Sequence, residues 1–171
     1  ANGQKLILLW FGSWKNSMSC YAPSWVKRGF NSEFELAANS DGSIPEIMSA
    51  FSERNVRADA KAFASLMKYI RKADGSEGTV IMVQVENEIG MLGDARDHSK
   101  LAQNAYNSPV PYDMMYMQTP GKANDHINDV WKAAGKATTG SWKDVFGSSL
   151  EADEIFMAYW YARYTERVAA A

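Results

Sequence analysis

The sequence predicts an α/β fold in which parallel strands are buried against helices. Two apolar runs of strand length, residues 6–11 (LILLWF) and residues 80–85 (VIMVQV), carry this prediction. Neither run shows the strict alternation of a half-buried strand, so we expect both to be covered on their two faces, as in a parallel sheet. A long amphipathic helix lies between them, and the three elements then form a βαβ unit with a right-handed crossover.

The linking helix is predicted from its two ends and from its apolar spacing. Ser52 is the expected N-cap, and Gly75 is expected to end the helix. Between them, apolar side chains recur at spacings of four and three residues, which places them on one helical face. These side chains are Val56, Ala60, Phe63, Met67 and Ile70.

The remaining segments are less regular. Residues 31–50 are rich in Asn, Ser, Asp and Gly and are interpreted as irregular surface. About sixty residues separate the second strand from a last helix, which we expect to begin with a capping box at residues 148–151. We interpret this stretch as a decorated loop with a short amphipathic helix near residues 127–134 and a turn at residues 142–146.

Composition excludes several classes of protein. The 171 residues are 46% apolar and 22% charged, which suits one packed domain over residues 1–171. The net charge of -2 is spread without a basic stripe, so we expect no nucleic-acid partner. The longest apolar stretch, eight residues from Ile155 to Ala162, is too short to enter a membrane as a helix. A single cysteine, Cys20, excludes an internal disulfide and a thiolate metal cluster.

The chain starts at Ala1 without an initiator Met or a signal segment and soon enters an apolar run. We interpret it as a piece of a longer protein, whose compartment stays open, with export from a bacterium as one option.

Polar and aromatic residues follow both predicted strands, at the sheet edge where parallel α/β proteins bind ligands. At the end of the first strand and just after it these are Trp10, Ser13, Trp14, Lys15 and Asn16; after the second strand they are Glu86, Asn87 and Glu88. Strand parity predicts that Gln84, Glu86 and Glu88 point to the same side. A partly desolvated Glu88 would serve as a general acid, with Asn87 beside it for a substrate hydroxyl. The alternative is that the acids cap the strand and pair with basic side chains.

The residues around Glu88 resemble a known family. Residues 79–90 (TVIMVQVENEIG) are similar to the strand-4 motif of family 35 glycoside hydrolases, the β-galactosidases of a retaining (β/α)8 clan. Residues 8–26 and 91–98 resemble the strand-3 loop and the continuation after strand 4 in a bacterial subgroup of these enzymes. The resemblance covers most of the chain. It implies part of a TIM (β/α)8 barrel, from about strand 3 to helix 4, with a long decorated loop after strand 4.

The resemblance also implies a function. It predicts retaining hydrolysis of O-glycosidic bonds in β-galactosides or oligosaccharides, with Glu88 as acid/base, Asn87 at the sugar's 2-hydroxyl, and no metal or cofactor. Trp10 and Trp14 are then candidate sugar platforms, and Lys15 and Asn16 are candidate hydrogen-bonding residues. The family's Cys-Ala-Glu-Trp at the end of strand 3 is replaced by residues 10–14 (WFGSW), which lack the acid and leave the sugar open.

The family's nucleophilic Glu lies on strand 7, which this chain does not reach. Retention requires two carboxyls about 5–5.5 Å apart on different sides of the sugar. The candidates in the chain are Glu86, Asp94 and Asp97, and Glu86 is expected on the same strand face as Glu88. We therefore expect the chain alone to be inactive, and its uncovered strand edges to cause self-association or low stability.

Other functions are weaker. His98 and His126 do not form a metal-ligand pattern, Cys20 lacks a catalytic context, and residues 75–78 (GSEG) are not followed by the Lys-Ser/Thr of a phosphate loop. Three alternatives remain open: another retaining β-glycosidase, an arabinofuranosidase, and a carbohydrate-binding module without catalysis.

Overall fold

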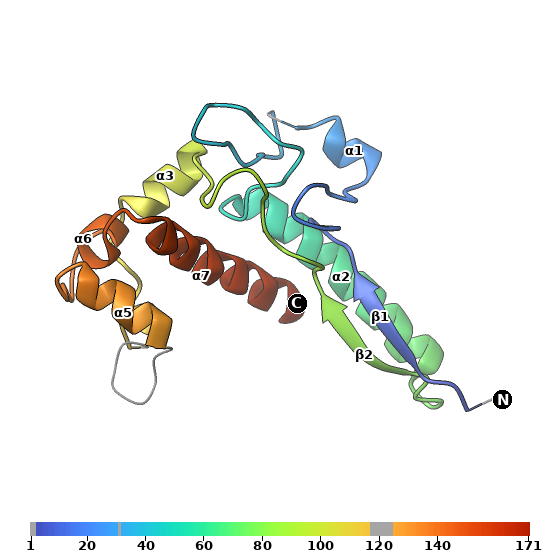
Figure 1. Ribbon diagram of the computed structural model, residues 1–171. Coiled ribbons are helices and arrows are strands. Elements are labelled where there is room, and N and C mark those ends of the chain that lie inside the picture. The colour runs from blue at the N-terminus through green and yellow to red at the C-terminus, as the bar shows by residue number, and fades with distance from the viewer. Residues whose placement is uncertain (1–2, 31, 117–124) are drawn as a thin grey trace.

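The computed structural model describes residues 3–30, 32–116 and 125–171, and these ranges contain two strands and seven helices (Figure 1). In chain order the elements are β1 Leu6–Trp10, α1 Ser24–Lys27, α2 Glu53–Asp74, β2 Val80–Val85, α3 Lys100–Tyr106, α4 Tyr112–Tyr116, α5 Asp125–Ala133, α6 Trp142–Phe146 and α7 Leu150–Ala169.

The two strands pair in parallel, with Leu8 opposite Val83 and Trp10 opposite Val85. Since α2 connects them, the predicted βαβ unit is confirmed. One face of the sheet packs on α2 and α7, and side chains from all four elements share a core cluster. This cluster includes Trp10, Val83 and Val85 of the sheet, Phe63 of α2 and Tyr164 of α7.

The predicted partial (β/α)8 barrel is wrong for the part of the chain that the structure describes. The sheet has only two strands in these ranges, and each strand has one unpaired edge. Burial of the strands on both faces is also wrong, because Ile7, Leu9 and Met82 are each more than half exposed. The apolar runs predicted that both faces of the sheet are covered. Within the described ranges, no element covers the face that carries Ile7, Leu9 and Met82.

The segment after β2 forms more structure than a decorated loop. Four helices, α3 to α6, pack with the first half of α7 around an aromatic cluster. Phe156 is fully buried there, stacked on Phe51 and edge-to-face with Tyr106 and Trp142. The large aromatic area buried by these rings explains why this region folds as a second, helical layer.

Helix boundaries were predicted well where capping residues define them. Ser52 accepts a hydrogen bond from the Asn55 N–H at the start of α2, and Gly75 follows its last residue, as expected. At α7 the expected capping box is displaced: Ser149 is the N-cap and its side chain accepts from the Ala152 N–H. A complete capping box opens α6 instead, where Ser141 and Asp144 bond reciprocally.

Residues 32–50 contain no named helix or strand, yet the prediction of irregular surface is only half right. Ala37, Ile47 and Met48 are buried, and Ser49 is fully buried. The segment forms an irregular layer over the N-terminal end of α2, where the Asn55 side chain donates to two of its carbonyls.

No helix among the described residues has the length and apolar character needed to cross a membrane.

Candidate functional site

The backbone changes direction directly after β2. Glu86 and Glu88 adopt left-handed conformations, with φ of 61° and 45°, which non-glycine residues rarely occupy. As a result the strand parity is lost: Glu86 turns into the interior and is 4% exposed, whereas Gln84 and Glu88 are exposed. The expectation that these three side chains share one side is therefore wrong. Such strained residues cluster at functional sites.

Glu88 presents an unengaged carboxylate. Its backbone carbonyl accepts a hydrogen bond of 3.0 Å from the Ser17 hydroxyl, which ties the end of β2 to the loop after β1. Within the described ranges, no hydrogen bond or ion pair engages its side chain. The pairing with a basic side chain that we considered as the alternative is therefore not seen at Glu88.

Asn87 is held in place by the same two segments. Its Nδ2 donates to the Lys15 carbonyl at 2.7 Å, and its Oδ1 accepts from Gln84 Nε2 at 2.9 Å. An amide has two N–H donors and two acceptor lone pairs, so one of each remains for a ligand. The structure thus places Asn87 against the Lys15 backbone, and the Glu88 backbone against Ser17, at the carboxyl end of the sheet.

A cavity of about 730 Å3 begins at the next residue, Ile89, and extends between residues 89–95 and α7. Its wall includes Met91, Met157 and Tyr161, with the carboxylate of Asp94 at one side. Glu88 itself does not line this hollow.

The residues predicted after β1 have different environments. Trp14 is fully buried, edge-to-face with Tyr161 and Tyr164, so it is a core residue and does not line an open site. Trp10 is half-buried, and its indole N–H donates to Asp59 at 2.8 Å. Lys15 and Asn16 are partly exposed in a turn, in which Asn16 Oδ1 accepts from the Met18 N–H and the Ser19 hydroxyl.

Sequence reasoning missed a pair of buried acids formed by Asp59 of α2 and Glu86. Asp59 accepts from the indole of Trp10, from the backbone and hydroxyl of Ser13, and from the hydroxyl of Tyr164. Glu86 accepts one hydrogen bond, from the Trp14 N–H at 3.0 Å, while its Oε1 lacks a partner of ordinary geometry among the described residues.

The environment of Glu86 favours its neutral form. Burial is the largest cause and the neighbouring Asp59 carboxylate adds to it, so that the pKa of Glu86 is raised to about 10. Glu86 is therefore a protonated, internal group near neutral pH. Glu86 therefore cannot serve as the nucleophilic carboxylate, or as a base, in a catalytic pair with Glu88.

Asp94 and Asp97, the other candidate partners of Glu88, have structural roles. Asp97 is fully buried and accepts from the Ala38 N–H, the Ser49 hydroxyl and the Ser99 N–H. Burial alone would raise the pKa of Asp94, but hydrogen bonds from Ser40 and the nearby His98 lower it to about 2. Both acids fix the irregular layer to the segment after β2.

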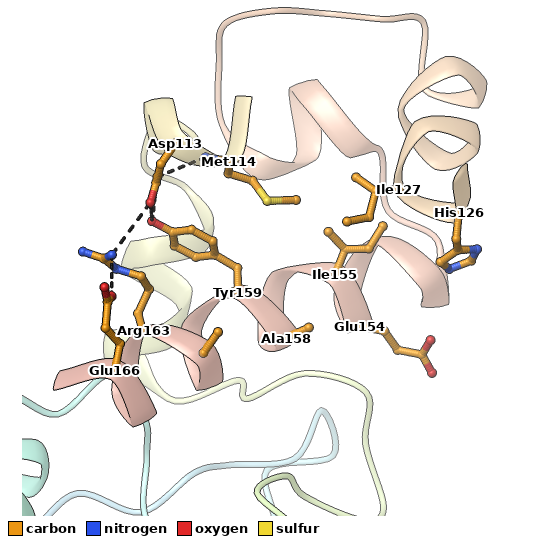
Figure 2. Close-up of a pocket in the computed structure, with 11 residues that line it drawn as sticks. Asp113, Met114, His126, Ile127, Glu154, Ile155, Ala158, Tyr159, Arg163 and Glu166 are labelled. Carbon is orange, nitrogen blue, oxygen red and sulfur yellow. Dashed lines mark hydrogen bonds and ion pairs between the residues drawn. The ribbon is translucent and has the colours of Figure 1, made fainter. Parts of the chain in front are cut away.

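A further cavity of about 700 Å3 lies between α4, α5 and α7 (Figure 2). Figure 2 shows Arg163 between Asp113 and Glu166, with the Tyr159 hydroxyl donating to Asp113 at 2.9 Å. These contacts pair Asp113, Arg163 and Glu166 with one another without a ligand. Among the described residues, no group of three or more His, Cys, Asp or Glu side chains lies close enough to hold a metal ion.

The chain matches no protein-family model, and the search of curated proteins finds no related sequence. The residues themselves therefore carry the functional argument.

Proposed function

We propose that this chain supplies the proton-donating segment of an enzyme that hydrolyses O-glycosidic bonds, with β-galactosides as the substrate class. Glu88 is the general acid/base, and Asn87 contacts the 2-hydroxyl of the sugar. The observation that carries the proposal is the free Glu88 carboxylate beside a fixed Asn87 amide, in a segment that resembles the acid/base motif of family 35 glycoside hydrolases.

The local geometry suits proton transfer. A general acid must reach the departing oxygen, and an exposed carboxyl group without an ion pair, in its protonated form, is able to do so. In the proposed reaction the Glu88 proton passes to the glycosidic oxygen as the bond from that oxygen to C1 breaks. The resulting carboxylate then takes a proton from the water that attacks C1.

The neighbouring residues supply the sugar contacts in this proposal. Asn87 is bonded to the Lys15 carbonyl and keeps one N–H and one lone pair for ring hydroxyls, and the loop with Lys15 and Asn16 offers further donors and acceptors. The hollow that begins at Ile89 lies one residue beyond Glu88 and is not lined by Glu88 itself, so in this proposal the leaving group occupies the solvent-exposed side of Glu88. Trp14 has no part in this scheme because it is fully buried.

A retaining reaction needs a second carboxyl about 5–5.5 Å from the first. Glu86 is internal and neutral, and Asp94 and Asp97 are held by other residues, so the partner must come from outside the described part of the chain. We therefore expect no hydrolysis by the chain alone.

A small external nucleophile replaces the missing carboxyl and makes the proposal testable on this chain. Azide attacks C1 of a nitrophenyl β-galactoside from the face opposite the leaving group, the bond to the phenolic oxygen breaks, and Glu88 protonates that oxygen. The product is α-galactosyl azide. We expect it to form only when both the chain and azide are present.

Glu88→Gln should abolish azide product from substrates with poor leaving groups. Glu77→Gln is the matched control, because Glu77 is an exposed glutamate next to the opposite end of β2. If the Glu88→Gln chain forms α-galactosyl azide at the same rate as the wild type, the assignment of Glu88 is overturned. An equal loss of this product in the Glu77→Gln control would overturn it as well.

A further inference from the structure

A third cavity, of about 240 Å3, lies where β1 and the loop after it meet α1 and α2. Aromatic side chains form much of its wall, and two polar side chains of α2 complete it. The aromatic residues are Trp10, Phe11, Tyr21 and Trp25, and the polar residues are Asn55 and Asp59. Neither Glu88 nor Asn87 contributes to this wall, so it is distinct from the site proposed above.

The outer aromatic rings are exposed although neighbouring rings hold them. Trp25 is 56% exposed and meets Phe34 edge-to-face at 5.5 Å, and Tyr21 is 60% exposed and meets Phe11 edge-to-face at 5.7 Å. Edge contacts of this kind fix a ring and leave a face available. Exposed aromatic faces around a hollow attract apolar groups and organic cations.

Asn55, one of the residues that line this cavity, has an unused acceptor. Its Nδ2 donates to the Glu35 carbonyl at 2.8 Å and to the Ser49 carbonyl at 3.0 Å, so the amide cannot rotate without losing both bonds. The residue is fully buried, and its Oδ1 has no partner among the described residues. A buried carbonyl without a donor is costly, and a ligand N–H would satisfy it.

The wall also carries an unbalanced negative charge. Asp59 is 7% exposed, its hydrogen-bond donors are neutral, and no Lys, Arg or His lines the cavity within the described ranges. The cations of the neighbouring segments are engaged elsewhere, since Lys27 pairs with Glu46 and Arg54 pairs with Glu33. Buried charge favours a counter-charge close by.

From these features we propose that this cavity binds the primary ammonium group of a small organic ligand. The ammonium donates one N–H to Asn55 Oδ1, lies in the field of Asp59, and rests against the faces of Trp25 and Tyr21. The volume of about 240 Å3 is below the range of ordinary ligand pockets, so it holds a head group with a short alkyl chain.

The donor requirement separates this ligand from related ones. A quaternary ammonium group has the charge but no N–H for Asn55, and a neutral alcohol has a donor but no charge for Asp59. Each should bind more weakly than a primary ammonium with the same apolar surface.

The test is a titration of the 15N-labelled chain with n-butylammonium chloride, followed through the indole N–H resonances of Trp10 and Trp25. We expect saturable shifts of both, and much smaller shifts with n-butanol, tetramethylammonium chloride or sodium chloride at the same concentrations. Trp25→Ala should weaken n-butylammonium binding about tenfold, the loss of one partly desolvated cation–π contact. Tyr69→Ala, which removes an exposed ring of α2 outside the cavity, should leave it unchanged.

Three results would overturn the proposal. The first is the absence of saturable shifts with n-butylammonium in a chain whose amide spectrum shows it to be folded. The second is equal affinity for n-butanol or tetramethylammonium, and the third is an equal loss in the Trp25→Ala and Tyr69→Ala chains.

Discussion

Replacing Glu86 with glutamine should make the stability of the chain less dependent on pH. Glu86 is buried beside Asp59, and its pKa rises from 4.5 to about 10 on folding. Glutamine has nearly the same shape and stays neutral at every pH. Its amide still meets the Trp14 N–H through an oxygen, and it offers an N–H where the protonated acid has its O–H.

The size of the effect follows from proton linkage. Below its unfolded pKa of 4.5, Glu86 is protonated in both the folded and the unfolded chain, so its ionisation does not change the free energy of unfolding. Above it, the unfolded chain releases a proton that the folded chain keeps, so the free energy of unfolding falls by about 1.4 kcal/mol per pH unit until pH approaches the folded value. Between about pH 5 and about pH 8 the loss is about 4 kcal/mol.

Urea unfolding at several pH values within this window measures the effect. The Glu86→Gln chain and the wild type should have similar free energies of unfolding near pH 5. As pH rises, the variant should become progressively more stable than the wild type, because only the wild type loses stability through Glu86. Glu77→Gln, at an exposed position, should differ from the wild type by a small constant amount. If the difference in the free energy of unfolding between Glu86→Gln and the wild type does not change with pH, Glu86 is not a buried, protonated acid in the folded chain.

Three further predictions concern packing. A Cβ on Gly12 would lie 2.1 Å from Asp59 Oδ1, so Gly12→Ala should lower the free energy of unfolding by about 1–3 kcal/mol, and a neutral result in urea would contradict this close approach. Phe156→Ala removes a fully buried ring and should cost about 3–5 kcal/mol, whereas a cost typical of surface positions would contradict its place in the core. Leu9 is 51% exposed on the open sheet face, so Leu9→Lys should reduce self-association in sedimentation velocity, and a monomeric wild type would contradict that expectation.

The sequence predicted local structure best where its signals are local. The start of α2 follows from the side chain of Ser52, its end from Gly75, and its buried face from residues spaced three and four apart. The parallel pairing of the strands followed from their apolar runs and the helix between them. Each of these signals lies within one element or at its ends.

The barrel was wrong because it came from a resemblance and not from the number of strands in the chain. Apolar strand runs indicate surfaces that favour burial, but they do not show which element covers them. Ile7 and Met82 therefore remain exposed in the described structure. The aromatic residues of α6 and α7 instead bury one another in a helical layer.

The error at Glu86 arose from the backbone. Left-handed conformations are expected at Gly and Asn, so nothing in the letters indicates a positive φ at two glutamates. One feature of the sequence does indicate a buried acid. Asp59 lies three residues after Val56 and four before Phe63, on the buried face of α2. A carboxylate on such a face requires a polar partner.

The dependence of azide-supported turnover on the leaving group tests the role of Glu88 most directly. A proton donor matters most for a basic leaving group and hardly at all for an acidic one. We predict that Glu88→Gln lowers the rate with phenyl β-galactoside by about 100-fold or more and leaves the rate with 2,4-dinitrophenyl β-galactoside nearly unchanged. An equal loss with both substrates, or no loss with either, would show that Glu88 does not donate the proton.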